Sequence, residues 1–327
     1  MTTSAQIEEL KTLVEPGKVL TDADSLDTYG KDWTKHFAPA PCAIVFPKTI
    51  EQVQAIVRWA NAHKVALVPS GGRTGLSAAA VAANGEVVVS FDYMNQILEF
   101  NEMDRTAVCQ PGVVTAQLQQ FAEDKGLYYP VDFASAGSSQ IGGNIGTNAG
   151  GIKVIRYGMT RNWVAGMKVV TGTGELLELN RDLIKNATGY DLRQLFIGAE
   201  GTLGVVTAAT LKLFPIMRSR AVAVVGLETA AASVELLARA KAETGGGVEA
   251  FELMKRLGME LVLKNIPDTR EPLESTPPWY VLIEIASGTP GGADDPESFG
   301  GQRARGRGAD SGAGAGDHRD AHGAFFS

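Results

Sequence analysis

The chain has 327 residues, 44% hydrophobic and 20% charged, which is typical of a globular protein with room for two domains. A net charge of −7 argues against nucleic-acid binding, because nucleic-acid phosphates are bound by basic surfaces. With only Cys42 and Cys109, and no apolar run near the roughly 20 residues of a membrane span, the sequence predicts a reduced, cytoplasmic protein without a disulfide framework.

The first part of the chain is predicted to alternate strands with helices after a helical lead-in at residues 1–37. The apolar run from Cys42 predicts a strand, and Thr49 with Gln52 forms a capping box at the start of a helix. Apolar residues recur in this helix at intervals of three and four, so that one of its faces is buried. The other elements predicted here are strands at 65–69, 86–91 and 105–110 and a helix around 115–125.

The later part begins with a predicted β-hairpin at 164–179, whose alternating strands flank a glycine-containing turn. Asp191 is expected to cap a short helix, and a β-branched run after Gly204 predicts a strand that ends at Pro215. Residues 219–286 then follow the order strand, helix, strand, helix, strand. This order is typical of an α/β layer with helices on one sheet face, and we expect a second domain here.

The composition changes abruptly at Gly291. Residues 291–327 contain no Leu, Ile, Val, Met, Lys, Trp or Tyr, and ten of these 37 residues are Gly. Such a segment buries too little apolar area to offset the entropy of ordering it, so disorder is predicted. It is either a natural flexible tail or an out-of-frame translation product, and we favour the second because the break falls where another helix is expected.

Three segments are dense in glycine: 69–77 (PSGGRTGLS), 137–151 and 198–204. Glycine has no Cβ and permits positive φ, so that backbone N–H groups can converge on an anion. The dinucleotide fingerprint Gly-x-Gly-x-x-Gly is absent, and the first segment lacks the Lys of a nucleotide-triphosphate loop. The pattern therefore predicts a phosphate-bearing cofactor bound by a fold of another class.

The segments PSGGRTGLS, SSQIGGNIGTNAGGIKVIRYG and KNATGYDLRQLFIGAEGTLGVVT, in this order, closely resemble the FAD-linked oxidase family. This is the vanillyl-alcohol-oxidase-like family with a PCMH-type FAD domain, and the resemblance is to its D-lactate, glycolate and D-2-hydroxyglutarate dehydrogenase branch. It is strong over residues 40–215 and weaker beyond. It implies an α+β fold with a two-subdomain FAD-binding domain at 38–216 and an incomplete ferredoxin-like cap at 217–290.

The same resemblance implies which residues bind FAD. The first segment is expected around the pyrophosphate, the second beside the flavin and its ribityl chain, and the third near the same cofactor. The implied cofactor-binding residues are Ser70, Gly71, Gly72, Arg73, Thr74, Gly75, Ser77, Pro111, Gly112, Ser138, Gly142, Gly143, Asn144, Thr147, Asn148, Gly150, Gly151, Tyr157, Gly158, Glu200, Gly201, Gly204 and Val205.

Non-covalent FAD is expected, because the His or Cys that tethers flavin in some relatives is missing from these segments. The family's reaction transfers a hydride from a D-2-hydroxy acid to the flavin, giving a 2-oxo acid, while a base takes the hydroxyl proton. The implied partners are this anionic substrate, an electron acceptor (a quinone, an electron-transfer flavoprotein or oxygen) and a second copy or partner subunit. Location is expected to be cytoplasmic or peripheral to the inner membrane.

Full-length relatives carry a divalent metal, but no residues matching its ligands, the base or the substrate clamp are found in this chain, so catalytic residues stay unassigned. Two alternatives are therefore kept open: a catalytically incomplete FAD-binding fragment, and an electron-transfer subunit that depends on a partner for substrate.

A histidine pair, a group of basic residues and one cysteine could each suggest a functional site, but each also has a simpler interpretation. His318 and His322 have the spacing of a zinc pair, but their surroundings are glycine-rich and lack the metalloprotease Glu, so no metal site is predicted. Lys153, Arg156 and Arg161 either add positive potential near the cofactor or form a solvated face. Cys109 is predicted to be a small buried hydrophobic residue.

Overall fold

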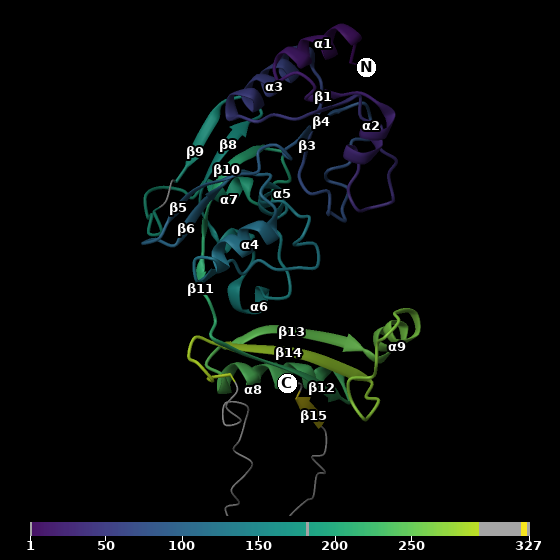
Figure 1. Cartoon of the computed structure of the whole chain (residues 1–327), viewed down its shortest axis with the longest axis vertical. Helices are drawn as coiled ribbons and strands as arrows, with labels where there is room; N and C mark the ends of the chain where they lie inside the picture. Colours follow the sequence, from purple (N-terminus) through teal and green to yellow (C-terminus); the bar gives the residue numbers. More distant parts are fainter. Residues whose placement is uncertain (1, 181–182, 294–321, 326–327) are drawn as a thin grey trace, which may run out of the picture. The chain divides into compact units, whose positions relative to one another are not determined.

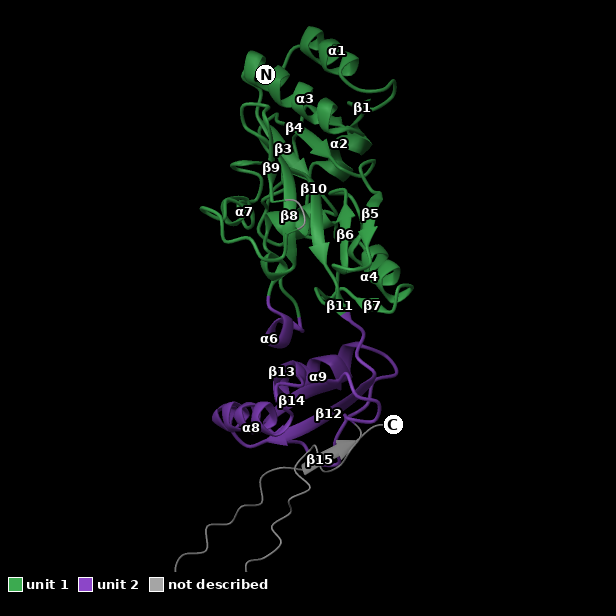
Figure 2. Ribbon diagram, turned by 90° about the vertical axis from the view of Figure 1, so that its left-hand side faces the viewer, with its two compact units in different colours: residues 1–151, 159–214 green, residues 152–158, 215–327 purple. Residues whose placement is uncertain are grey.

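The computed structural model describes residues 2–180, 183–293 and 322–325 (Figure 1). The chain divides into two compact units, residues 1–151 with 159–214 and residues 152–158 with 215–327 (Figure 2). Both units combine helices with sheets, which confirms the predicted α+β class.

The first sheet of unit 1 has the strand order β1-β2-β4-β3, and its β2, β4 and β3 are parallel. Side chains of α1 and α3 pack on one face, and those of α2 contribute to a smaller cluster on the other. The bounds are α1 (Ser4–Thr12), β1 (Val19–Leu20), α2 (Ala23–Tyr29), β2 (Ala43–Val45), α3 (Ile50–His63), β3 (Leu67–Ser70) and β4 (Val87–Ser90).

Helix α3 begins as the sequence predicts. The Thr49 hydroxyl accepts a hydrogen bond from the Gln52 N–H (3.2 Å), and five apolar residues of the helix are buried. The Gln52 side chain, however, accepts from the N–H of Lys48 (2.7 Å), one residue before the position expected for a capping box.

The second sheet of unit 1 is antiparallel, with the order β5-β6-β10-β8-β9. It contains the predicted hairpin, formed by β8 and β9, and one strand that was not predicted, β5, which pairs with β6. The bounds are β5 (Ile97–Asn101), β6 (Thr106–Cys109), α4 (Thr115–Glu123), β7 (Leu127–Tyr128), α5 (Ile141–Gly146), η1 (Thr160–Asn162), β8 (Val164–Thr171), β9 (Leu176–Leu179), α7 (Arg193–Phe196) and β10 (Gly204–Lys212).

Unit 2 is built on an antiparallel sheet with the order β13-β14-β12-β15. Its core joins apolar residues of this sheet to Leu236, Leu237 and Ala240 of α8. The bounds are α6 (Val154–Tyr157), β11 (Phe214–Pro215, at the junction with unit 1), β12 (Ser219–Leu227), α8 (Ala230–Glu243), β13 (Val248–Lys255), α9 (Arg256–Asn265), β14 (Trp279–Ser287) and β15 (His322–Phe325).

The two compact units can be compared with the expected bounds of the FAD-binding domain and of the C-terminal tail. Residues 152–158, expected inside the FAD-binding domain, group with unit 2, and Figure 2 colours α6 accordingly. Of the tail predicted to be disordered, residues 294–321 and 326–327 lie outside the described residues. Within the described part, Ala293 is buried and its N–H donates to the Ser219 hydroxyl (2.9 Å).

Candidate cofactor site

The first two glycine segments approach each other at backbone level. A Cβ at Gly72 would fall on the carbonyl oxygen of Ser138 and lie 2.8 Å from Cα of Ser139. A Cβ at Gly71 would lie 3.5 Å from Oε1 of Gln140. The loop after β3 therefore rests directly on the start of the second segment, and a side chain at Gly72 would force the two apart.

The third segment joins the same region. Its Glu200 N–H donates to the Gly146 carbonyl (2.9 Å), and the Gly198 N–H donates to the Ile145 carbonyl (3.0 Å). A Cβ at Gly201, where φ is +81°, would lie 2.5 Å from Cγ of Pro69. All three segments that the sequence singled out are thus brought together within unit 1.

The first loop presents unused hydrogen-bond donors. Within the described residues, the N–H groups of Gly71 to Gly75 make no hydrogen bond to the protein, and neither does that of Gly143. Arg73 in this loop has φ of +58°, and a left-handed residue in a turn can direct neighbouring N–H groups toward one point. This arrangement suits the oxygens of a pyrophosphate.

Three buried polar atoms beside the loop have no hydrogen-bond partner among the described residues: Oγ of Ser70, Oε1 of Gln140 and Oδ2 of Asp32. Asp32 is 7% exposed, and its Oδ2 lies 3.3 Å from the Cβ position of Gly75. Buried polar atoms without partners cost stability, so their clustering beside free N–H groups fits a polar ligand that supplies the missing partners.

Asp32, Asp92 and Gln140 were not predicted as site residues. Asp92 follows β4, which runs parallel to β3, so it emerges at the same sheet edge as the first glycine loop. Ligands of open parallel sheets bind at the carboxyl ends of the strands, and that rule could have drawn attention to Asp92. Asp32 lies in the lead-in, where no motif marks it, but the N–H of its neighbour Trp33 donates to the Gly75 carbonyl (3.0 Å).

The other predicted cofactor residues fall into three groups. Gly142 contacts Pro111, to whose carbonyl its N–H donates (2.7 Å), while the Asn144 side chain donates to Thr115 (2.7 Å) and is buried within the protein. The converging segments contain Thr74, Ser77, Thr147, Asn148, Gly150, Gly151, Gly201 and Gly204, whereas Gly112 and Val205 lie outside these segments in the same unit. Tyr157 and Gly158 lie in unit 2, where the Tyr157 hydroxyl donates to Glu249.

Lys153 and Arg156 match neither interpretation given to them from sequence. Lys153 is 5% exposed and pairs with Glu249 (3.1 Å) and Glu284 (3.2 Å). Arg156 donates to the carbonyl of Ala286 (2.8 Å) and also contacts Glu249 (3.4 Å). Both side chains are engaged in a buried ion-pair network of unit 2. Arg161, in unit 1, donates to Gln194 (2.8 Å).

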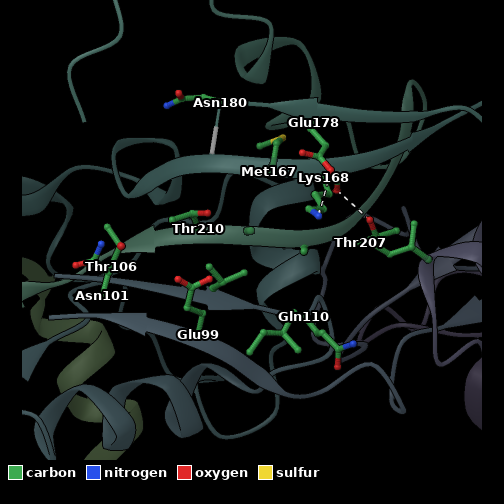
Figure 3. A pocket seen from close by; sticks show the side chains of 15 residues that line it. Glu99, Asn101, Thr106, Gln110, Met167, Lys168, Glu178, Asn180, Thr207 and Thr210 are labelled. Atoms are coloured by element: carbon green, nitrogen blue, oxygen red, sulfur yellow. Dashed lines mark hydrogen bonds and ion pairs between the residues drawn. The ribbon is translucent and has the colours of Figure 1, made fainter. Parts of the chain in front are cut away.

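A cavity of about 570 Å³ lies elsewhere in unit 1, against the second sheet, and both apolar and polar side chains line it (Figure 3). Lys168 of β8 and Glu178 of β9 form an ion pair at its edge (3.2 Å), and Thr106 and Thr210 contribute hydroxyl groups. None of the predicted cofactor residues lines this cavity. This cavity therefore does not coincide with the glycine segments.

Cys109 is fully buried in β6, as predicted, and burial raises the pKa of its thiol to about 12. The thiolate is the reactive form of cysteine, so Cys109 is expected to resist alkylation in the folded chain. Titration with a thiol reagent near pH 8 should modify the half-buried Cys42 and, only after denaturation, Cys109. Modification of both thiols at equal rates under native conditions would contradict this placement.

No described helix is long and apolar enough to cross a membrane. Likewise, the described residues hold no group of three or more His, Cys, Asp or Glu placed to bind a metal ion.

Residues 41–180 match the family described as FAD binding domain. This range contains the first two glycine segments, so the likeness to an FAD binding domain falls on the motifs that the sequence singled out.

Among curated relatives, the chain is 74% identical over 289 residues to D-2-hydroxyglutarate dehydrogenase of Stutzerimonas stutzeri, a match that covers 88% of this chain and 62% of the relative. It is 49% identical over 286 residues to the protein of the same name from Xanthomonas citri pv. viticola, covering 88% of this chain and 60% of the relative. The chain thus spans about three fifths of the length of these relatives.

Solved structures share the fold at low sequence identity. An alkyldihydroxyacetonephosphate synthase superposes with a TM-score of 0.76 at 20% identity, covering 91% of this chain and 58% of the other. A p-cresol methylhydroxylase superposes with a TM-score of 0.73 at 20% identity, covering 90% and 63%. These likenesses confirm the fold class recognised from the motifs.

Proposed function

We propose that the converging glycine segments hold FAD non-covalently, with its pyrophosphate over the free N–H groups of the first loop. The observation that carries this proposal is that set of free N–H donors in the first loop. The unpartnered oxygens of Gln140 and Asp32 accept hydrogen bonds, so we assign their partners to the hydroxyl or N–H groups of FAD and not to its pyrophosphate. The FAD binding domain match over residues 41–180 supports the same cofactor. Segments 69–77 and 137–151 contain neither His nor Cys, which supports non-covalent binding.

We further propose that the substrate is a D-2-hydroxy acid, with D-2-hydroxyglutarate favoured by the names of the two relatives above. FAD, when bound, supplies an acceptor for the hydride that leaves the α-carbon. The hydroxyl proton goes to a base and the product is the 2-oxo acid. The described residues act at the cofactor: they bind its phosphates and fix its position. A divalent metal has no fitting residues among them, so no step is assigned to it.

A Gly143→Ala variant tests where the cofactor lies. A Cβ at Gly143 meets no atom within 4 Å, and Gly143 lies inside α5, where Ala is a better helix former, so the variant should fold at least as stably as the parent chain. If FAD passes over Gly143, the added methyl group occupies space that the cofactor needs, and FAD affinity should fall roughly tenfold to hundredfold. Flavin fluorescence titration measures this change. An affinity equal to that of the parent chain would place the cofactor elsewhere.

Reduction by substrate tests the activity. The purified chain, saturated with FAD under anaerobic conditions, is mixed with D-2-hydroxyglutarate, D-lactate or the achiral glycolate, and L-2-hydroxyglutarate and L-lactate are the controls. Bleaching of the flavin absorbance by a D-acid supports the dehydrogenase. Flavin that binds but never bleaches would support the alternatives of an FAD-binding fragment or an electron-transfer subunit. A chain that binds no FAD would contradict the cofactor assignment. The acceptor, the oligomeric state and the cytoplasmic location remain predictions.

A further inference from the structure

Arg73 is unusual within the first glycine loop because it combines a strained backbone with a charged side chain. Its φ of +58° lies in the left-handed region, which costs a non-glycine residue energy and persists only where surrounding contacts hold it. The two flanking positions are Gly72 and Thr74. Something must therefore hold Arg73 in this conformation, and its own side chain supplies the contacts.

The guanidinium group of Arg73 makes three contacts with the protein, two hydrogen bonds and one cation–π contact. One Nη donates to the carbonyl of Gly71 (3.0 Å), and the other donates to Oδ2 of Asp92 (3.3 Å). The group also lies 4.7 Å from the centre of the Tyr29 ring, a cation–π distance. The bond to Gly71 closes the loop on itself, because it joins the side chain of Arg73 to a backbone group two residues earlier.

Asp92 extends this set of contacts to the second glycine segment. Its Oδ1 accepts a hydrogen bond from the Gln140 side chain (2.7 Å), while its Oδ2 accepts from Arg73. Gln140 immediately precedes α5, and it is 7% exposed. Arg73, Asp92 and Gln140 thus form a continuous chain of hydrogen bonds from the first glycine loop to the second, and we call it the loop bridge.

We propose that Arg73 and Asp92 are positioning residues, which hold the first loop in its anion-binding conformation and at a fixed distance from the second segment before the cofactor arrives. In this role Arg73 is not the counter-charge of the phosphates. Backbone N–H groups supply that attraction, and Asp92 neutralises the arginine. The proposal rests on the proposed function, since it assigns roles at the FAD cradle.

The alternative role for Arg73, a direct phosphate ligand, predicts the opposite response at Asp92. If Arg73 bound phosphate directly, Asp92→Asn would free its positive charge, and FAD would bind more tightly or equally well. If the loop bridge positions the loop, the same substitution weakens FAD binding, because the link between Arg73 and Gln140 is lost. The sign of the Asp92→Asn effect therefore separates the two roles.

The experiment measures the FAD dissociation constant of the parent chain, Arg73→Ala, Asp92→Asn and the double variant, at a temperature where all are folded. Each single variant should bind FAD roughly tenfold to hundredfold more weakly, the range for losing a hydrogen bond to a charged group. The double variant should be little worse than either single one, because both break the same bridge. Arg73→Lys should not restore binding, since one ammonium cannot reproduce the two-armed contact.

Glu271→Gln in unit 2 is the matched control. Glu271 forms an ion pair with Arg256, and their side chains are 23% and 25% exposed. The side chains of Arg73 and Asp92 are each 24% exposed, so the two ion pairs are equally accessible to solvent. This variant should leave FAD affinity unchanged. Additive losses in the double variant, tighter binding by Asp92→Asn, or full rescue by Arg73→Lys would overturn the proposal.

A cofactor-free measurement keeps this test separate from that of the proposed function. Leu76 in the first loop is 76% exposed, and thermolysin cleaves before exposed leucines. Without FAD, Arg73→Ala and Asp92→Asn should be cleaved there faster than the parent and Glu271→Gln, because the loop is no longer held. Equal cleavage rates would contradict the loop bridge. Failure of the parent chain to bind FAD would instead contradict the proposed function alone.

Discussion

Gly72→Ala is expected to weaken FAD binding roughly a hundredfold or more, the cost of overpacking a rigid contact. The new methyl group would fall on the carbonyl oxygen of Ser138. This obstacle is backbone, so no side-chain rotation relieves it, and the first loop must move away from the second segment. Moving the loop displaces the free N–H groups that we propose to bind the pyrophosphate. Flavin fluorescence titration measures the affinity.

Gly172→Ala provides the control for this variant. Gly172 also lies in unit 1, but a Cβ there meets no atom within 4 Å, and its φ is not in the left-handed region. The control should bind FAD like the parent chain and unfold at the same urea concentration. If Gly72→Ala also bound FAD with parental affinity, the close approach of the two segments would have no role in holding the cofactor.

Local patterns predicted much of the fold and the position of the candidate site. Helix α3 followed from the spacing of its apolar residues and from Thr49, and the hairpin of β8 and β9 from alternation around a turn. The three glycine segments indicated one site because glycine density has a local physical cause, the need for close backbone approach. Each of these signals is contained within about fifteen residues of sequence.

Features that depend on distant partners were missed. Strand β5 was not predicted because its five residues carry little alternation, and its pairing with β6 contains an irregularity between Ile97 and Glu99. No local motif marks Asp92. Its link to the second glycine segment depends on Gln140, which lies 48 residues later in the sequence and donates a hydrogen bond to the Asp92 carboxylate. Lys153 was interpreted from its position next to the second glycine segment. Its partner Glu249, however, lies 96 residues further along the chain.

Glu249 is the centre of that long-range network, and its removal should have the largest effect on stability. The side chain is fully buried on β13, and it accepts hydrogen bonds from Tyr157 and Lys153 and pairs with Arg156. Arg220 also lies within ion-pair distance (3.6 Å). Glu249→Leu would remove the carboxylate that Lys153, Arg156 and Arg220 share. We expect unit 2 to lose about 3–5 kcal/mol, the cost of stranding a buried charge.

The network should also make unit 2 sensitive to acid. Burial alone would raise the pKa of Glu249, but the Tyr157 hydroxyl and the Lys153 ammonium outweigh it, so the pKa lies below the ordinary value of 4.5. A carboxyl whose pKa is depressed by folding stabilises the folded state at pH values above its unfolded pKa. That stabilisation is lost as the pH falls through the lower, folded pKa. Glu249→Gln should abolish this part of the acid sensitivity.

Hydrogen exchange of β13 and β14, followed against urea and pH, measures both effects within unit 2 itself. Glu252→Gln is the control, because Glu252 lies on the same strand but is exposed. Lys153→Met should also be costly, whereas the Lys153→Met/Glu249→Leu double variant should lose less than the sum of the two, since neither charge is then left without the other. Strict additivity, or a Glu249→Leu variant as stable as the Glu252 control, would show that segment 152–158 is held to unit 2 by its apolar contacts alone.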